Sequence, residues 1–180
     1  MRFSVLVSLL AASATNAIKI PEGQPDGVYS VDLSRRAQRR AGAWTLIEEF
    51  NTTDIASRDL SSELNARAPL PSPHSQCKSE VKLDGTNLQQ ARSKFKDRAI
   101  AGDKIGSNKA LAVIYGSVVY YACSWGGSNP VRVGEIDESD KKMEKDCGVA
   151  EAGIVIIDAW KKIYGRDNIA NEICWGNPWS

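Results

Sequence analysis

The chain has 180 residues, which is about the length of one domain. Its 23 basic and 22 acidic residues leave a net charge of +1, so no strong electrostatic field favours nucleic acid or an anionic membrane. With 42% hydrophobic residues, the composition is that of a folded globular protein and excludes a fully disordered chain.

The N-terminus has the anatomy of a secretory signal peptide. Arg2 provides a positive start, the apolar run Phe3–Ala12 follows, and Thr15 and Ala17 are small residues at the spacing of a cleavage site. An apolar run of about ten residues is too short to span a bilayer. We therefore expect residues 1–17 to be removed by cleavage after Ala17 and the rest of the chain to be secreted.

Residues 18–67 contain no cysteine and carry signals for proteolytic processing. Two dibasic pairs end at Arg36 and Arg40, and a single arginine, Arg67, precedes a proline-rich run over residues 69–74. Kexin-like proteases of the secretory pathway cut after such pairs in exposed, extended segments. We therefore predict that residues 18–67 are a propeptide or linker.

Two further features lie within this predicted propeptide. Val28–Leu33 has the composition of one short strand. Asn51 begins the sequon Asn-Thr-Thr, so a glycan is expected there in a secreted protein.

Residues 68–180 are predicted to be the mature domain, which holds all four cysteines. Its first element is a helix over Thr86–Ile100, because four apolar side chains recur at helical spacing. Asp84 or Thr86 is suited to cap its start, and Gly102 to end it. The stripe consists of Leu88, Ala91, Phe95 and Ala99.

The clearest core signal is a hairpin formed by Lys109–Tyr115 and Val118–Trp125. Gly116 at the first position of a two-residue turn suits a type II′ hairpin, and this turn fixes the register. Both faces of the hairpin are apolar, so both should be buried. The predicted pairs are Tyr115–Val118, Val113–Tyr120 and Leu111–Ala122 on one face, and Ile114–Val119, Ala112–Tyr121 and Ala110–Cys123 on the other.

A second helix is predicted over Glu135–Cys147, with Gly148 as its C-terminal cap. Its acidic start and basic end suit the helix dipole. The continuous apolar run Gly153–Asp158 predicts a buried strand, and Asn171–Trp175 a final edge strand. The fold class predicted is therefore α+β: a small antiparallel sheet packed by two helices and held by two disulfides.

Four cysteines in an oxidising compartment indicate two disulfides. Cys123 ends a hairpin strand, and Cys147 ends a helix whose apolar stripe returns to that sheet. We therefore favour Cys123–Cys147, with Cys77–Cys174 joining the ends of the domain. Four cysteines allow three pairings, and the other two stay open.

The sequence offers few candidates for catalysis. His74 is the only histidine and lies in the proline-rich run, where no supporting groups are expected. The acidic residues at the start of the second helix compensate its dipole, although Glu135 with Arg132 would suit a hydrolase or ribonuclease-like enzyme if they met in a cleft. We expect no metal site, because no closely spaced ligands occur, and no cofactor.

Tryptophans beside glycine-rich loops indicate a binding surface, since such side chains anchor sugars, lipids or proteins. One group follows the hairpin and the other is the C-terminus. The candidate residues are Trp125, Gly126, Gly127, Asn129, Trp175 and Trp179.

Three short stretches complete the pattern: Val-Val-Tyr-Tyr-Ala-Cys at the end of the hairpin, Asp-Cys-Gly at the end of the second helix, and Ile-Cys-Trp-Gly near the C-terminus. With the signal peptide and the trimmed prosequence, this layout resembles the small secreted fungal proteins of the killer-toxin and Ecp2-effector (Hce2) kind. The resemblance covers roughly Cys77 to Trp179. It implies a non-enzymatic protein that acts on a host or on competing microbes.

We therefore expect a secreted effector or killer-toxin-like protein that works by binding. Its partner would be a host or microbial surface component, whether protein, glycan or lipid, and not nucleic acid; the protein itself is expected to be a monomer. The alternatives are the hydrolase or ribonuclease-like enzyme and a carbohydrate-binding module, which would need exposed coplanar aromatic rings.

Overall fold

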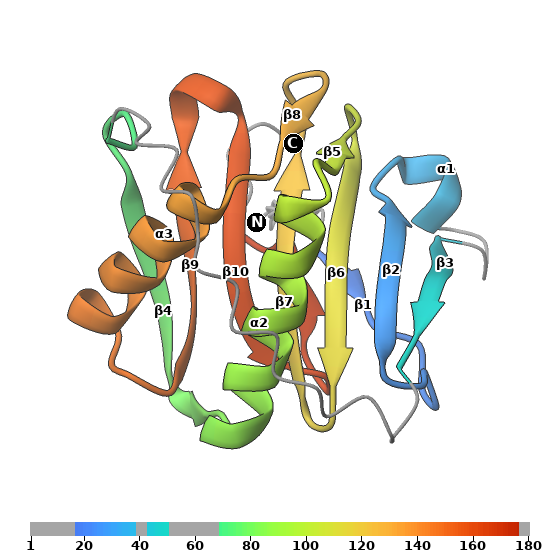
Figure 1. Ribbon diagram of the computed structural model, residues 1–180, viewed down its shortest axis with the longest axis horizontal. Helices are drawn as coiled ribbons and strands as arrows, with labels where there is room; N and C mark the ends of the chain where they lie inside the picture. The colour runs from blue at the N-terminus through green and yellow to red at the C-terminus, as the bar shows by residue number, and fades with distance from the viewer. Residues whose placement is uncertain (1–16, 39–42, 51–68, 177–180) are drawn as a thin grey trace, which may run out of the picture.

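The computed structural model describes residues 17–38, 43–50 and 69–176. Within them, seven strands form one antiparallel sheet, and the helices α2 and α3 lie side by side on one of its faces (Figure 1). The fold is therefore α+β, as predicted, but the sheet is larger than the small one expected. The strands, in spatial order, are β3 (Trp44–Glu49), β2 (Gly27–Asp32), β6 (Lys109–Tyr115), β7 (Val118–Ser124), β10 (Lys162–Asn168), β9 (Glu151–Ile157) and β4 (His74–Lys82).

The predicted hairpin is confirmed as β6 and β7, and all six predicted residue pairs occur in its register. Gly116 has φ +55°, a conformation that glycine adopts without steric cost. A side chain at this position would also collide with the amide of Asn87. Side chains on both faces of the hairpin are buried, as its apolar pattern predicted.

Both predicted helices are confirmed. Helix α2 (Gly85–Ile100) begins at Asp84, whose carboxylate accepts a hydrogen bond from the backbone N–H of Asn87. Helix α3 (Val133–Asp146) ends next to Gly148, which has φ +119°. The apolar stripes of both helices pack on the same side of the sheet, which we call the helix face. Their buried apolar residues are Leu88, Ala91, Phe95, Ile136 and Met143.

The opposite side of the sheet, the back face, is covered by described segments that lie near the two ends of the chain, residues 18–20 and 172–175. Strand β1 (Ile18–Lys19) pairs with β11 (Glu172–Ile173) to form a separate two-stranded sheet. The predicted edge strand near the C-terminus therefore exists but is shorter, and it does not extend the main sheet. The remaining short elements are α1 (Arg35–Gln38), β5 (Lys104–Ile105), β8 (Asn129–Pro130) and the 3-10 turn η1 (Asp158–Trp160).

The region predicted to be a propeptide contributes to this same fold. Strand β2 differs by only one residue at each end from the predicted strand Val28–Leu33. It lies between β3 and β6, and the side chains of Val28, Tyr29 and Val31 are almost fully buried. Proteolytic processing stays a prediction, because Arg40 and Arg67 lie outside the described residues. Arg36 lies on α1 and is exposed.

Strand β10 was not predicted, although it occupies a central position between β7 and β9. Its sequence, Lys-Ile-Tyr-Gly-Arg-Asp-Asn, has too many charges for the pattern of a buried strand. All three of its charged side chains are nevertheless buried, because groups on neighbouring elements neutralise them. They are Lys162, Arg166 and Asp167.

The predicted disulfide pairing is wrong. The bonds are Cys77–Cys147 and Cys123–Cys174. The insertion of β10 explains the difference: it separates the hairpin from β9, so α3 packs over β9 and β4 and Cys147 meets the edge strand β4 instead of β7. The C-terminal segment crosses the back face and brings Cys174 to Cys123.

Disulfides are typical of extracellular proteins, which agrees with the expected route of secretion. No helix among the described residues is long and apolar enough to cross a bilayer. The expected signal peptide, residues 1–17, lies outside the described part of the chain except for Ala17.

Candidate functional site

The predicted binding loop follows β7 at one end of the sheet. The backbone N–H of Trp125 donates to the carbonyl of Lys161, and the amide of Asn129 donates to the Ser124 hydroxyl and to the carbonyl of Trp160. Gly126 packs against Trp160 so closely that a Cβ would lie 2.7 Å from the Trp160 carbonyl oxygen. Gly127 has φ +96° and open space around it. The loop is therefore fixed at its base and exposed at its tip.

Three positive side chains lie close to this loop. Lys104 is on β5, which pairs with β8 within the loop. Lys161 lies between η1 and β10, and Arg132 immediately precedes α3. All three are exposed. We call this surface the loop end and define it as Trp125–Pro130 with Lys104, Arg132 and Lys161. Its charge favours contact with acidic groups.

The second predicted group, at the C-terminus, does not join the loop end. Trp175 is partly buried against the back-face core, and its indole N–H donates to the carboxylate of Asp167 at 3.2 Å. Lys78 also donates to Asp167 and lies 4.6 Å from the centre of the Trp175 ring. Asp167 is near the end of β10, whereas Trp125 is next to the start of that strand. The two tryptophans thus contact opposite ends of β10, and Trp179 lies outside the described residues.

The acidic cluster of α3 has a different role from the one predicted. Glu135 is 1% exposed, and its carboxylate accepts hydrogen bonds from Lys162 at 2.7 Å and from the Tyr164 hydroxyl at 2.8 Å. Lys162 is equally buried and also donates to the carbonyl of Pro130. The pair therefore joins α3 to β10 inside the protein, rather than only compensating a helix dipole.

Asp140, one turn further along α3, forms a second buried cluster. Its carboxylate contacts Arg92 of α2 and Arg166 of β10 and accepts a hydrogen bond from the Tyr120 hydroxyl. Burial raises the pKa of Asp140 above its ordinary value, and the two guanidinium groups oppose that rise. Burial likewise raises the pKa of Tyr120 well above its ordinary value, so the phenol stays protonated. We call Glu135, Lys162, Tyr164, Tyr120, Asp140, Arg92 and Arg166 the charged layer.

A signal for the charged layer was present in the sequence. Ile136, Asp140 and Met143 recur at i, i+4 and i+7, so Asp140 lies on the stripe that faces the sheet. A carboxylate on a buried stripe requires a cation opposite it. Lys162 and Arg166 were missed because they belong to β10, which was not predicted, whereas Arg92 lies on the predicted helix α2.

The arrangement predicted for a hydrolase is only partly present. Arg132 approaches Glu135 at 3.9 Å, but it is half-exposed while the carboxylate is buried beneath it. Acid–base catalysis needs a group within hydrogen-bond reach of the substrate. The buried carboxylates of Glu135 and Asp140 therefore have no such access in this conformation.

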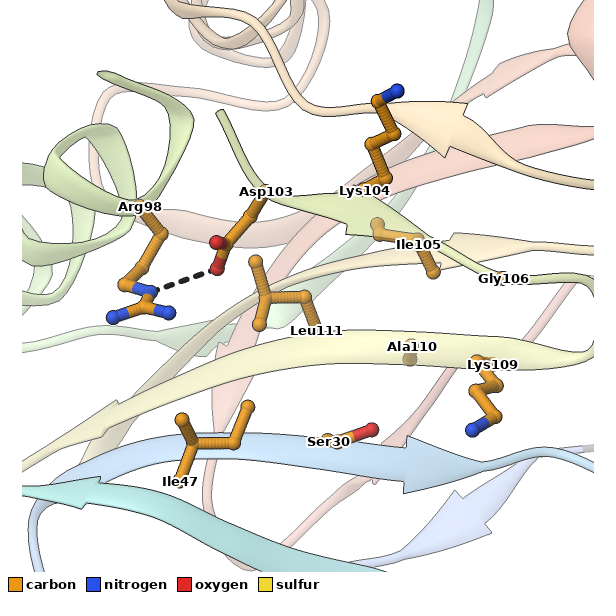
Figure 2. A pocket seen from close by; sticks show the side chains of 10 residues that line it. All are labelled: Ser30, Ile47, Arg98, Asp103, Lys104, Ile105, Gly106, Lys109, Ala110 and Leu111. Atoms are coloured by element: carbon orange, nitrogen blue, oxygen red, sulfur yellow. Dashed lines mark hydrogen bonds and ion pairs between the residues drawn. The ribbon is translucent and has the colours of Figure 1, made fainter. Parts of the chain in front are cut away.

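A hollow on the described surface lies beside the C-terminal half of α2 (Figure 2). Its volume is about 250 Å³, which is below the roughly 300–1,000 Å³ of small-molecule sites. Arg98 is paired with Asp103 at its edge, whereas Lys104 points away from it. Ile47 and Leu111 contribute its apolar part. The hollow brings no pair of catalytic groups together.

Three predictions remain. His74 is on edge strand β4, exposed, and 3.4 Å from the carboxylate of Asp158. Asn51 lies outside the described residues, and no group of side chains suited to a metal occurs within them.

Comparisons of the chain with family models, with curated proteins and with solved structures found no match.

Proposed function

We propose that this protein is a secreted, non-enzymatic effector or killer-toxin-like protein that binds a host or competitor target through the loop end. The observation that carries the proposal is the separation of two kinds of polar group. The carboxylates suited to catalysis are buried and paired with cations, whereas the cations of the loop end are exposed. Two half-buried tryptophans lie beside them, Trp125 packed on the back-face core and Trp160 on the helix-face core. Such a surface is suited to contact and not to turnover.

The build of the loop end supports a rigid binding surface. Its base is held by hydrogen bonds from Asn129 and from the backbone of Trp125, so little conformational entropy is lost when a partner binds. Tryptophan rings supply large contact areas, and nearby cations direct the approach of an acidic partner. The structure does not favour a carbohydrate-binding module, because Trp125 and Trp175 contact opposite ends of β10.

The test is a binding assay with the fluorescently labelled, secreted protein on intact host cells and on cells of competing microbes. Trp125→Ala should reduce the bound fraction at least about tenfold, the range expected when a central aromatic contact is lost. Val149→Ala is the matched control: this residue is 74% exposed but lies at the other end of the molecule, after α3. The control should bind like the unmodified protein.

Trp125 also packs against the back-face core, so its loss must be separated from unfolding. Both variants are therefore compared with the unmodified protein in thermal unfolding. The charge reversals Lys104→Glu and Lys161→Glu provide a second approach, since both side chains are exposed. Unchanged binding of these variants and of folded Trp125→Ala would overturn the proposal, as would cleavage of host or microbial polymers by the protein.

A further inference from the structure

The two disulfides have very different access to solvent. Cys123 and Cys174 are both 0% exposed and lie within the back-face core. Cys77 is exposed on edge strand β4, and its partner Cys147 is partly exposed at the end of α3. A thiol in solution must reach the sulfur that it attacks, so the two bonds should react with thiols at different rates.

We propose that Cys77–Cys147 is a thiol–disulfide exchange site for low-molecular-weight thiols of the glutathione type, and that Cys123–Cys174 is inert under the same conditions. The attack falls on the sulfur of Cys77, the more exposed member of the pair. This inference is independent of the proposed function, because it uses only the position of the two bonds.

The exchange takes two steps. A small-molecule thiolate attacks Sγ of Cys77, the Cys77–Cys147 bond breaks, and the sulfur of Cys147 leaves as a thiolate that takes a proton from water. A second small-molecule thiolate attacks the sulfur of the small molecule in the mixed disulfide and releases Cys77 as a thiolate. The protein is reduced by two electrons, and two small thiols are oxidised to their disulfide.

Other contacts keep β4 in place after the bond opens. The main chain of β4 pairs with β9 from His74 to Lys78. Ser75 donates a hydrogen bond to Asp146 at the end of α3, and Lys78 pairs with Asp167. Strand β4 is otherwise irregular, because its register shifts between Lys78 and Lys82. Opening should therefore loosen the β4–α3 edge without unfolding the sheet.

The experiment treats the folded, full-length secreted protein with reduced glutathione in the absence of denaturant. Free thiols are alkylated at intervals and located by peptide mass spectrometry. Alkylation of Cys147 and a glutathione adduct on Cys77 should appear at least about tenfold faster than any modification of Cys123 or Cys174, because a buried bond reacts only after the core opens. The near-ultraviolet circular dichroism should persist during the first phase.

Two variants complete the test. Cys77→Ser with Cys147→Ser should remove the fast phase, and Cys123→Ser with Cys174→Ser should leave it if that protein folds. Should the second variant not fold, the measurement on the unmodified protein stands alone. Equal rates at both bonds, faster reaction at Cys123–Cys174, or a first adduct on Cys147 would overturn the inference.

Discussion

The two faces of the seven-stranded sheet are covered in different ways. On the helix face, α2 and α3 pack through apolar stripes, but the charged layer lies between them and the sheet. On the back face, β1 and β11 pack on an apolar core that contains the Cys123–Cys174 bond. The position of the helices thus depends on charge neutralisation as well as on buried apolar area, while the back face depends on buried apolar area and a covalent bond.

Strand β10 serves both faces, because successive side chains of a strand point to opposite sides. Lys162, Tyr164 and Arg166 face the helices, and Ile163 and Gly165 face the back. We therefore predict that substitutions only a few residues apart on β10 change the free energy of unfolding through different interactions.

Removal of residues 1–67 should have the largest effect. A chain that begins at residue 68 loses β1, β2 and β3, and each fully buried apolar side chain contributes about 1.5–3 kcal/mol. The lost side chains include Ile18, Tyr29 and Val31, and β6 becomes an unpaired edge. We expect no cooperative thermal transition, measured by circular dichroism. A chain that begins at Ala17 is the control, and a similar melting temperature for both chains would contradict this prediction.

Loss of one partner in the charged layer should come next. Glu135→Ala leaves Lys162 buried without its carboxylate, which typically costs about 3–5 kcal/mol. The free energy of unfolding in urea measures this loss. Combining Glu135→Leu with Lys162→Met should recover most of it, because both charges are then absent. A loss below about 1 kcal/mol for Glu135→Ala would show that the pair behaves like a surface pair.

On the back face, a smaller but purely steric effect is expected at Gly165. A Cβ at this position would lie 2.4 Å from Cζ of Tyr121, so Gly165→Ala must displace the buried ring. Overpacking of this kind costs about 1–3 kcal/mol, and it should not depend on pH. Gly85→Ala is the matched control, because nothing lies within 4 Å of its Cβ position. Equal unfolding free energies for the two variants would argue against this packing.

The smallest effect should be a pH dependence that originates from the helix face. Burial raises the pKa of Asp140 above 3.8, so the folded state binds this proton more tightly than the unfolded state. The resulting stability is fully present below pH 3.8 and is lost as the pH rises through the higher folded pKa. Asn cannot titrate, so the stability of the unmodified protein relative to Asp140→Asn should fall as the pH rises.

Asp146 provides a control of opposite sign. Hydrogen bonds from Lys142 and Ser75 lower its pKa, so its contribution is present above 3.8 and is lost as the pH falls through the lower folded pKa. Urea unfolding of Asp140→Asn and Asp146→Asn at several pH values measures both contributions. Parallel pH profiles for Asp140→Asn and the unmodified protein would remove Asp140 as a source of pH dependence.

Local patterns predicted the elements that bury apolar side chains at a regular period. The hairpin register followed from Gly116 and its turn, both helices from their stripes and glycine caps, and strand β9 from its apolar run. The loop after Trp125 was also located correctly, because glycine and tryptophan mark it in the sequence. Its cationic surroundings were not predicted, since Lys104 and Lys161 come from distant segments.

The amino-acid sequence by itself therefore determined the α+β class, the presence of two disulfides and the elements with a regular apolar pattern, because short-range periodicity and turn chemistry are local properties. Only the tertiary structure decided which cysteines pair, where β10 lies, and that residues 18–38 and 43–50 belong to the fold. The local sequence pattern predicts exposed side chains at Lys162, Arg166 and Asp167. They are buried because Glu135, Asp140 and Lys78 reach them from other elements, and strand order, which no local pattern encodes, brings these charges together.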